Sequence, residues 1–322
     1  MRADSTTTLL IPMLCVVLAG SSGCTTAKPT PAQAIAQAPA CESLAAFDGA
    51  TCDPLGWFDV LLRVARADAV FVGETHDDAS GHKVEQALVA AFLLSHPKGA
   101  VSFEMLERDE QAALNDYLVG RVTLDTFLEG TKSRHWAGTD SWLPWYQPMI
   151  EFARVAGTPV VAANAPRTYV SRAMRDGYEP LQALPAAERA HFELDPALTR
   201  DGDWQRLKVL MTELHADRAH DEGVAATAPS DDDVDRVHRA QRVWDATMGA
   251  SAAAAYMRDG SVIHFAGGFH LEERLGTVAQ FMRRCPTARI LIIALHPTGS
   301  TELEPKSVKG ADIVVHTHAP IE

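Results

Sequence analysis

The sequence has few basic residues, no paired-cysteine motif and no apolar run long enough to cross a bilayer. Its 29 Lys and Arg are outnumbered by 42 Asp and Glu, giving a formal net charge of −13, and the basic clusters typical of nucleic-acid-binding proteins are missing. Nucleic acid is therefore not expected as a partner. The sequence contains no CxxC pair, which argues against zinc fingers and thioredoxin-like chemistry. No serine or cysteine nucleophile motif supports covalent hydrolysis.

The composition of the 322-residue chain is that of a globular protein. Hydrophobic residues make up 47% and charged residues 22% of it, which excludes fibrous, disordered and multi-span membrane proteins. One large domain, residues 55–322, accounts best for this length and composition.

The N-terminal segment has the features of an export signal. Residues 9–20 are apolar but too short for a spanning helix, as in the central region of a signal peptide. The segment ending at Cys24 resembles the lipobox of bacterial lipoproteins, which implies a signal peptide over residues 1–23 and lipidation of Cys24. We therefore expect a cell-envelope protein, anchored by lipid at the outer membrane or the periplasmic face. A released product of an ordinary signal peptide is the alternative.

Residues 24–54 connect the expected anchor to the domain. The stretch 25–40 is rich in Ala, Pro, Thr and Gln, a composition that cannot bury a core and indicates a flexible linker. In an oxidising compartment Cys41 and Cys52 would be placed to form a local disulfide loop, and the sequence leaves the pairing open.

Alternating strands and helices predict an α/β fold with a mostly parallel sheet flanked by helices. Apolar runs that fit buried strands occur at residues 69–73, 100–104, 159–163, 261–266 and 290–295, and their continuity favours strands that are covered on both faces. Residues 164–261 show only helical patterns. Because this is longer than one crossover needs, we predict a large helical insertion or lid subdomain.

Two strand ends carry the same Gly-x-x-His step, at Gly73 to His76 and at Gly267 to His270. Ligands of open parallel sheets bind beyond the carboxyl ends of the strands, so both histidines are candidates for one pocket. Glu74 belongs to the first step, and Glu104 ends another buried strand, where a carboxylate needs compensation. Glu74, His76, Glu104 and His270 together form a plausible set of ligands for a divalent metal such as zinc.

Several structural alternatives remain open for these residues. His76 would also fit the start of the following helix as a cap, and His270 has the same alternative. Glu74 and Glu104 would also fit a buried salt bridge with Arg167. His82, on the first turn of the predicted helix, fits either the pocket or the surface.

Three other histidines are predicted to be outside the site. His264 alternates within a strand, which is typical of a core histidine, whereas His316 and His318 near the C-terminus are expected to face solvent.

The motifs at these positions resemble the ChaN family of iron-regulated lipoproteins over roughly residues 55–300. The segments that carry the resemblance are Phe71 to Asp78 with His82, Phe103 to Met105, Tyr146, Ala163 to Arg167, Ala240 to Met248 and Ala266 to Leu271. The resemblance implies haem binding for haem or iron uptake, within a superfamily that includes Tiki metalloproteases and erythromycin-esterase-like enzymes.

The resemblance also implies roles for particular residues. It makes His76, His82, Tyr146, Arg167 and His270 candidates for cofactor binding. Relatives are thought to bind iron through a tyrosine, but residues 191–193 contain none.

Three functions follow as hypotheses. The first is a lipoprotein that binds haem or iron, with either one subunit or a homodimer holding the haem. The rival is a metal-dependent hydrolase in which Glu74 or Glu104 acts as general base on water bound to a metal held by His76 and His270. The third is an envelope interaction module with a degenerate pocket.

Overall fold

A computed structural model describes residues 36–195, 198–222, 225 and 227–320. The predicted signal peptide, Cys24 and most of the predicted linker lie outside these residues. No helix within the described ranges is long and apolar enough to cross a membrane.

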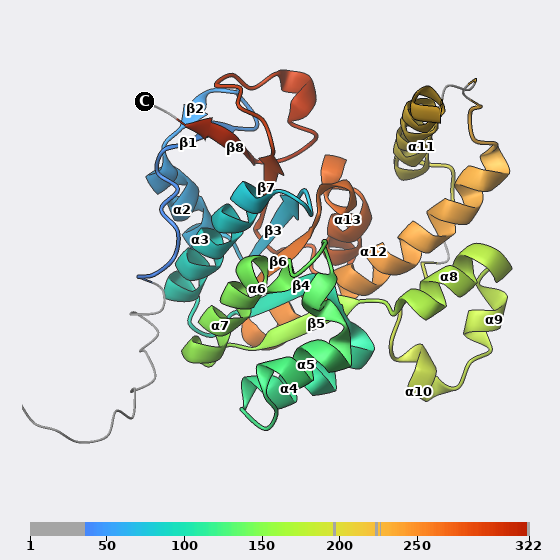
Figure 1. Cartoon of the computed structure of the whole chain (residues 1–322), viewed down its shortest axis with the longest axis horizontal. Coiled ribbons are helices and arrows are strands. Elements are labelled where there is room, and N and C mark those ends of the chain that lie inside the picture. The colour runs from blue at the N-terminus through green and yellow to red at the C-terminus, as the bar shows by residue number, and fades with distance from the viewer. Residues whose placement is uncertain (1–35, 196–197, 223–224, 226, 321–322) are drawn as a thin grey trace, which may run out of the picture.

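The centre of the molecule is a sheet of eight strands, mostly parallel, as predicted (Figure 1). Its order is β2-β1-β8-β7-β3-β6-β4-β5. The strands are β1 (Leu44–Asp48), β2 (Pro54–Leu55), β3 (Ala69–Glu74), β4 (Ala100–Glu107), β5 (Val160–Asn164), β6 (Val262–Gly267), β7 (Ile290–His296) and β8 (Ile313–Pro320). Strands β3 to β8 pair in parallel, and only β1 pairs antiparallel, with β2 and β8.

Helices cover both faces of the sheet. They are α2 (Trp57–Arg66), α3 (Ala79–Ser95), α4 (Gln111–Leu118), α5 (Leu124–Thr131), α6 (Trp142–Trp145), α7 (Gln147–Ala156), α8 (Arg167–Asp176), α9 (Glu179–Gln182), α10 (Ala186–Arg189), α11 (Gly202–Glu222), α12 (Asp231–Asp259) and α13 (Gly276–Arg284). Alternation along β3 divides the core: Val70 and Val72 pack on one face with α2 and α3, and Ala69 and Phe71 pack on the other with α12 and α13. This two-sided burial explains the continuous apolar strands.

The predicted helical insertion consists of α8 to α12 and forms a lobe beside the sheet (Figure 1). The last helix, α12, begins in this lobe, where a capping box between Ser230 and Asp233 fixes its start. Its C-terminal half runs back under the sheet, where Ala252 and Ala253 are fully buried. Thus α12 ties the lobe to the core and carries residues of the lobe toward the ends of the strands.

The structure answers the open question of the Cys41–Cys52 pairing and corrects one prediction made from the sequence. Cys41 and Cys52 are free thiols, because Cys41 is buried on the α2 and α3 face of the sheet while Cys52 packs toward the opposite face. His316 does not face solvent, because β8 is an internal strand of the sheet; its side chain is buried and its Nδ1 lies 2.6 Å from the Ser300 carbonyl oxygen. The exposure predicted for His318 is confirmed.

Candidate functional site

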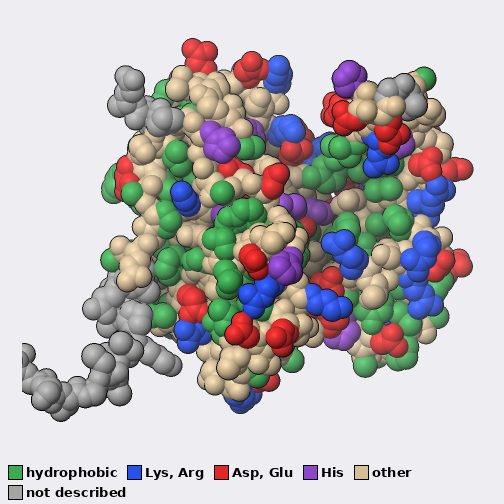
Figure 2. Space-filling model, in the orientation of Figure 1, with side chains coloured by type: hydrophobic (Ala, Val, Ile, Leu, Met, Phe, Trp, Pro, Cys, Tyr) green, Lys and Arg blue, Asp and Glu red, His purple; other side chains and the backbone are tan. Residues whose placement is uncertain are grey.

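A pocket of about 330 Å³ lies at the carboxyl ends of the central strands. It is lined by His76, Glu104, Glu107, Trp136, Ala137, Asn164, Arg167, Trp244 and His270. These side chains come from the ends of β3 to β6, from the loop before α6, and from α8 and α12. Figure 2 shows histidine side chains in the hollow between the helical lobe and the body that contains the sheet. The position agrees with the rule that open parallel sheets bind ligands at this edge.

His76 stands at the mouth of this pocket in a fixed orientation. Its Nδ1 lies 2.5 Å from Glu74 Oε1, and its ring packs edge-on against Trp136, with 4.7 Å between ring centroids. Its side chain is 42% exposed. Burial lowers the pKa of His76, but the hydrogen bond with Glu74 and the charge of Glu104 outweigh it, so the pKa is raised. The helix-cap alternative fails, because Asp78 caps α3 by accepting from Ser80 N.

Glu74 lies buried directly behind His76. Its Oε1 also accepts a hydrogen bond from the Tyr146 hydroxyl at 2.8 Å. Burial, and then the charge of Glu85, raises the pKa of Glu74 to about 8. Burial also raises the pKa of Tyr146 far above its usual range. Tyr146 therefore stays protonated, and its hydroxyl donates a hydrogen bond to the carboxyl oxygen.

His270 reaches the opposite wall of the pocket from the turn after β6. Its Nδ1 lies 2.8 Å from Asp245 Oδ1 on α12, and its Nε2 lies 3.7 Å from Glu104 Oε1. Burial lowers the pKa of His270, but the charges of Asp245 and Glu104 outweigh it and raise the pKa to about 9. At neutral pH His270 is therefore an imidazolium, with a proton on each nitrogen. It is not the cap of α13, which has Leu275 at that position.

The glycines of the two Gly-x-x-His steps are required by close contacts. A Cβ on Gly73 would lie 3.1 Å from the Cα of Gly268, and a Cβ on Gly267 would lie 3.0 Å from both Cε1 and Nε2 of His76. The Gly267 amide donates to Glu104 Oε2 at 2.7 Å. Because β3 and β6 are neighbours with Glu74 opposite Gly267, the two steps face each other, and glycine leaves the space for the imidazole.

The residues predicted from the sequence divide into two groups. His76, Glu104, Arg167 and His270 line the pocket together. Glu74, His82 and Tyr146 lie behind it, where Glu74 contacts both Tyr146 and His76; His82 and Tyr146 therefore do not face the pocket, contrary to the prediction that they contact a cofactor there. Arg167 forms no salt bridge with Glu74 or Glu104 in the described part of the chain, so that alternative also fails.

The predicted set of metal ligands is not a compact group. Among the described residues, the one cluster of three donors close enough to share an ion is Glu74, His82 and Glu85. The sequence argument missed Glu85, although its spacing of three residues from His82 places both side chains on one face of a helix. Asp245, which contacts His270, and Trp136, which packs against His76, were also missed. Neither residue follows a strand, so the position of strand ends does not predict them.

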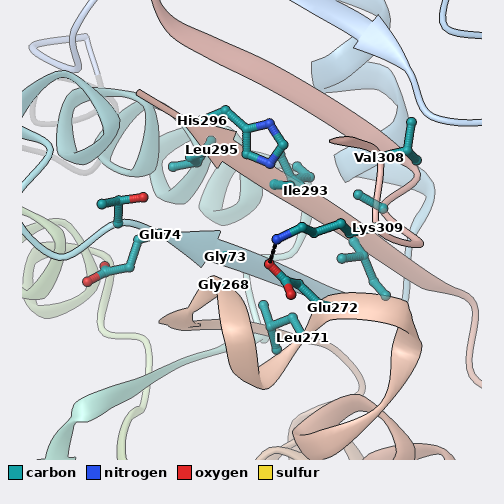
Figure 3. A pocket seen from close by; sticks show the side chains of 14 residues that line it. Gly73, Glu74, Gly268, Leu271, Glu272, Ile293, Leu295, His296, Val308 and Lys309 are labelled. Carbon is teal, nitrogen blue, oxygen red and sulfur yellow. Dashed lines mark hydrogen bonds and ion pairs between the residues drawn. The ribbon is translucent and has the colours of Figure 1, made fainter. Parts of the chain in front are cut away.

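The other side of Glu74 lines a second pocket, of about 200 Å³, which lies over the paired strands β3 and β7 and is closed by residues 268–272 and 308–311 (Figure 3). Lys309 Nζ and Glu272 Oε1 pair there at 2.8 Å. The Glu74 carboxylate points away from this pair (Figure 3). Glu74 therefore serves the histidine side of the molecule.

A family model described as "Haem-binding uptake, Tiki superfamily, ChaN" matches residues 60–281. The chain belongs to this family. Among solved structures, the ChaN-family fold is similar to one described as cofacial heme binding to ChaN of Campylobacter jejuni, with a TM-score of 0.58 and 17% identity. The alignment covers 85% of this chain and 96% of that chain. No curated protein sequence matches the chain.

Proposed function

We propose that this ChaN-family protein binds haem in the pocket between His76 and His270 and serves haem or iron uptake as a lipid-anchored protein of the cell envelope. The observation that carries the proposal is the fixed imidazole of His76. Glu74 holds Nδ1, which leaves Nε2 on the pocket side of the ring, next to Gly267. Metal-binding histidines are commonly oriented by a carboxylate in this way.

The residues around His76 fit a haem group. Haem capture needs apolar walls, an axial ligand and cations for the propionates. Trp136 and Trp244 supply aromatic walls, and Arg167 supplies an exposed cation at the rim. The pocket volume of about 330 Å³ falls in the range of roughly 300–1,000 Å³ usual for small-molecule sites. Haem iron, when bound, provides a Lewis acid for a neutral imidazole nitrogen.

Of the two histidines, His76 would hold the haem iron better than His270. The two nitrogens of His270 face the carboxyl groups of Asp245 and Glu104, so neither nitrogen is free to contact an iron ion in the pocket. His270 instead places a positive charge in the wall of the pocket. Other large aromatic and sulfur side chains of the helical segment are structural: Trp204 and Met211 pack together between α11 and α12, and Met248 is in the core.

Titration of the purified chain with hemin tests the proposal. We expect a shifted, saturable Soret band in the wild type and in the exposed-surface control His220→Ala, and loss of the shifted band in His76→Ala. Circular dichroism would confirm that the variant is folded. An unchanged band in His76→Ala would contradict the proposed site and place haem elsewhere, for example on the helical lobe.

A further inference from the structure

Three ionisable side chains form a fully buried cluster behind the haem pocket. Glu74 ends β3, while His82 and Glu85 lie on the first turns of α3. Their side chains are 1%, 1% and 0% exposed, and one donor atom of each lies within 4.8 Å of the other two. Two carboxyl groups so close together in the interior need a compensating charge or proton.

The hydrogen bonds of His82 direct one ring nitrogen into this cluster. Its Nε2 lies 3.1 Å from the backbone oxygen of His76. A carbonyl accepts only, so Nε2 carries the proton and, in a neutral ring, Nδ1 carries the lone pair. That Nδ1 lies 2.7 Å from Glu85 Oε2 and 3.9 Å from Glu74 Oε2. A neutral His82 therefore directs a lone pair at two carboxyl groups, an arrangement that needs either a proton or a metal cation among them.

Two carboxyl oxygens in the cluster accept from no donor group. Glu74 Oε2 and Glu85 Oε1 are buried, and the two carboxyl groups are close enough to share a hydrogen bond if one of them is protonated. Leaving such an atom unpaired in the interior is costly. Both oxygens belong to side chains that are otherwise held in place, since Glu74 Oε1 accepts from Tyr146 and Glu85 Oε2 faces His82. The unpaired oxygens are thus available to a ligand inside the cluster.

We propose that Glu74, His82 and Glu85 bind a divalent transition-metal ion such as Zn²⁺ or Mn²⁺. One imidazole nitrogen and carboxylate oxygens suit such ions. The surroundings are those of a metal site: the far nitrogen of His82 donates to a backbone carbonyl, as metal-bound histidines usually do. Trp145 stacks on the His82 ring, with 4.5 Å between centroids, and keeps it in place.

The site goes beyond haem binding but shares Glu74 with it. A cation on Oε2 would keep Glu74 ionised, and Oε1 of the same group orients His76. Without a cation, burial raises the pKa of both Glu74 and Glu85 to about 8. In that case a proton would have to compensate the pair.

Elemental analysis of the haem-free, full chain tests the metal site separately from haem. The chain is produced with added Zn²⁺ or Mn²⁺, freed of any affinity tag and dialysed against a chelator. We expect about one metal equivalent per chain in the wild type and about a tenth of that or less in Glu85→Gln, because the metal is held by the folded site. Asp77→Asn is the matched control, since it removes an exposed carboxylate from the same loop, and it should retain the metal.

Thermal unfolding keeps the test decisive if metal is lost during purification. Refolding with Zn²⁺ should raise the melting temperature of the wild type and not that of Glu85→Gln, because a ligand that binds only the native state stabilises it. Equal metal content in the wild type and Glu85→Gln would overturn the proposal. The proposal would also be overturned by a metal-free wild type whose melting temperature does not change with Zn²⁺ or Mn²⁺. Its infrared spectrum would then show a protonated carboxyl group. Loss of haem binding alone would leave this result unaffected.

Discussion

His76 and Glu74 are joined by a contact of 2.5 Å between Nδ1 and Oε1, and this contact sets the direction of the imidazole. The same oxygen accepts from Tyr146, so the carboxyl group is itself held in place. A buried network of this kind fixes a side chain better than packing alone, because each polar atom has a defined partner. The proposed haem pocket therefore depends on residues that do not line it.

Glu74→Gln should weaken hemin binding by about ten-fold or more, which is the usual cost of losing a group that orients a metal ligand. The amide keeps the size of the side chain but cannot be ionised, so it is a weaker partner for Nδ1 of His76. Affinity is measured from the Soret shift, with Asp77→Asn as a control for the lost negative charge. Equal affinities of the wild type and Glu74→Gln would show that Glu74 does not orient the ligand.

Gly267→Ala should also impair hemin binding, although Gly267 does not line the pocket itself. The new Cβ would lie 3.0 Å from two ring atoms of His76, so the ring must move. Gly267 has φ −53°, which alanine adopts freely. The matched control is Gly268→Ala, whose Cβ would meet only a backbone oxygen at 3.7 Å. Similar hemin affinity in the two variants would exclude the steric explanation.

The sequence predicted strands β3 to β7 but not β2, β1 and β8, which lie together on one side of the sheet. Strands such as β3 and β6 are apolar along their whole length because both faces are covered. By contrast, β2 has two residues, and β8 includes His316, Thr317 and His318 among its apolar residues. Strands of this kind depend on their pairing with neighbours, which a local pattern does not show.

The candidate site was predictable where it depends on strand order and not where it depends on helix packing. The two Gly-x-x-His steps converge because strand ends of a parallel sheet share one edge. Asp245 and Trp244 reach the site only because α12 returns from the helical lobe to the sheet. That path is set by tertiary packing, so no local pattern around Asp245 indicates its contact with His270.

Stability should depend on pH through His270. Its pKa is raised from 6.5 to about 9 in the folded protein, so its stabilising contribution is complete below pH 6.5 and is lost as the pH rises toward 9. Within that window the loss is about 1.4 kcal/mol per pH unit. Urea unfolding between pH 6 and roughly pH 9.5 should therefore show the advantage of the wild type over His270→Gln shrinking as the pH rises. Parallel curves for the two proteins would argue against a charged His270.

Arg167 should select for the propionates of haem and not for the macrocycle. It lines the pocket rim, and its guanidinium has no salt-bridge partner in the ranges that the structure describes. A charge-assisted hydrogen bond to a carboxylate contributes roughly 1.5–3 kcal/mol, so Arg167→Gln should weaken hemin binding about ten-fold. Binding of hemin dimethyl ester, which lacks the carboxylates, should hardly change.

Arg175→Gln provides the control for this last variant, because it removes an exposed cation from the same helix, α8, outside the pocket lining. It should bind hemin and its ester as the wild type does. Equal weakening of hemin and ester binding in Arg167→Gln would mean that Arg167 supports the shape of the pocket. Unchanged hemin binding would mean that the propionates point elsewhere. Only a loss confined to the free acid would fit a haem group whose carboxylates are held by Arg167 at the N-terminal end of α8.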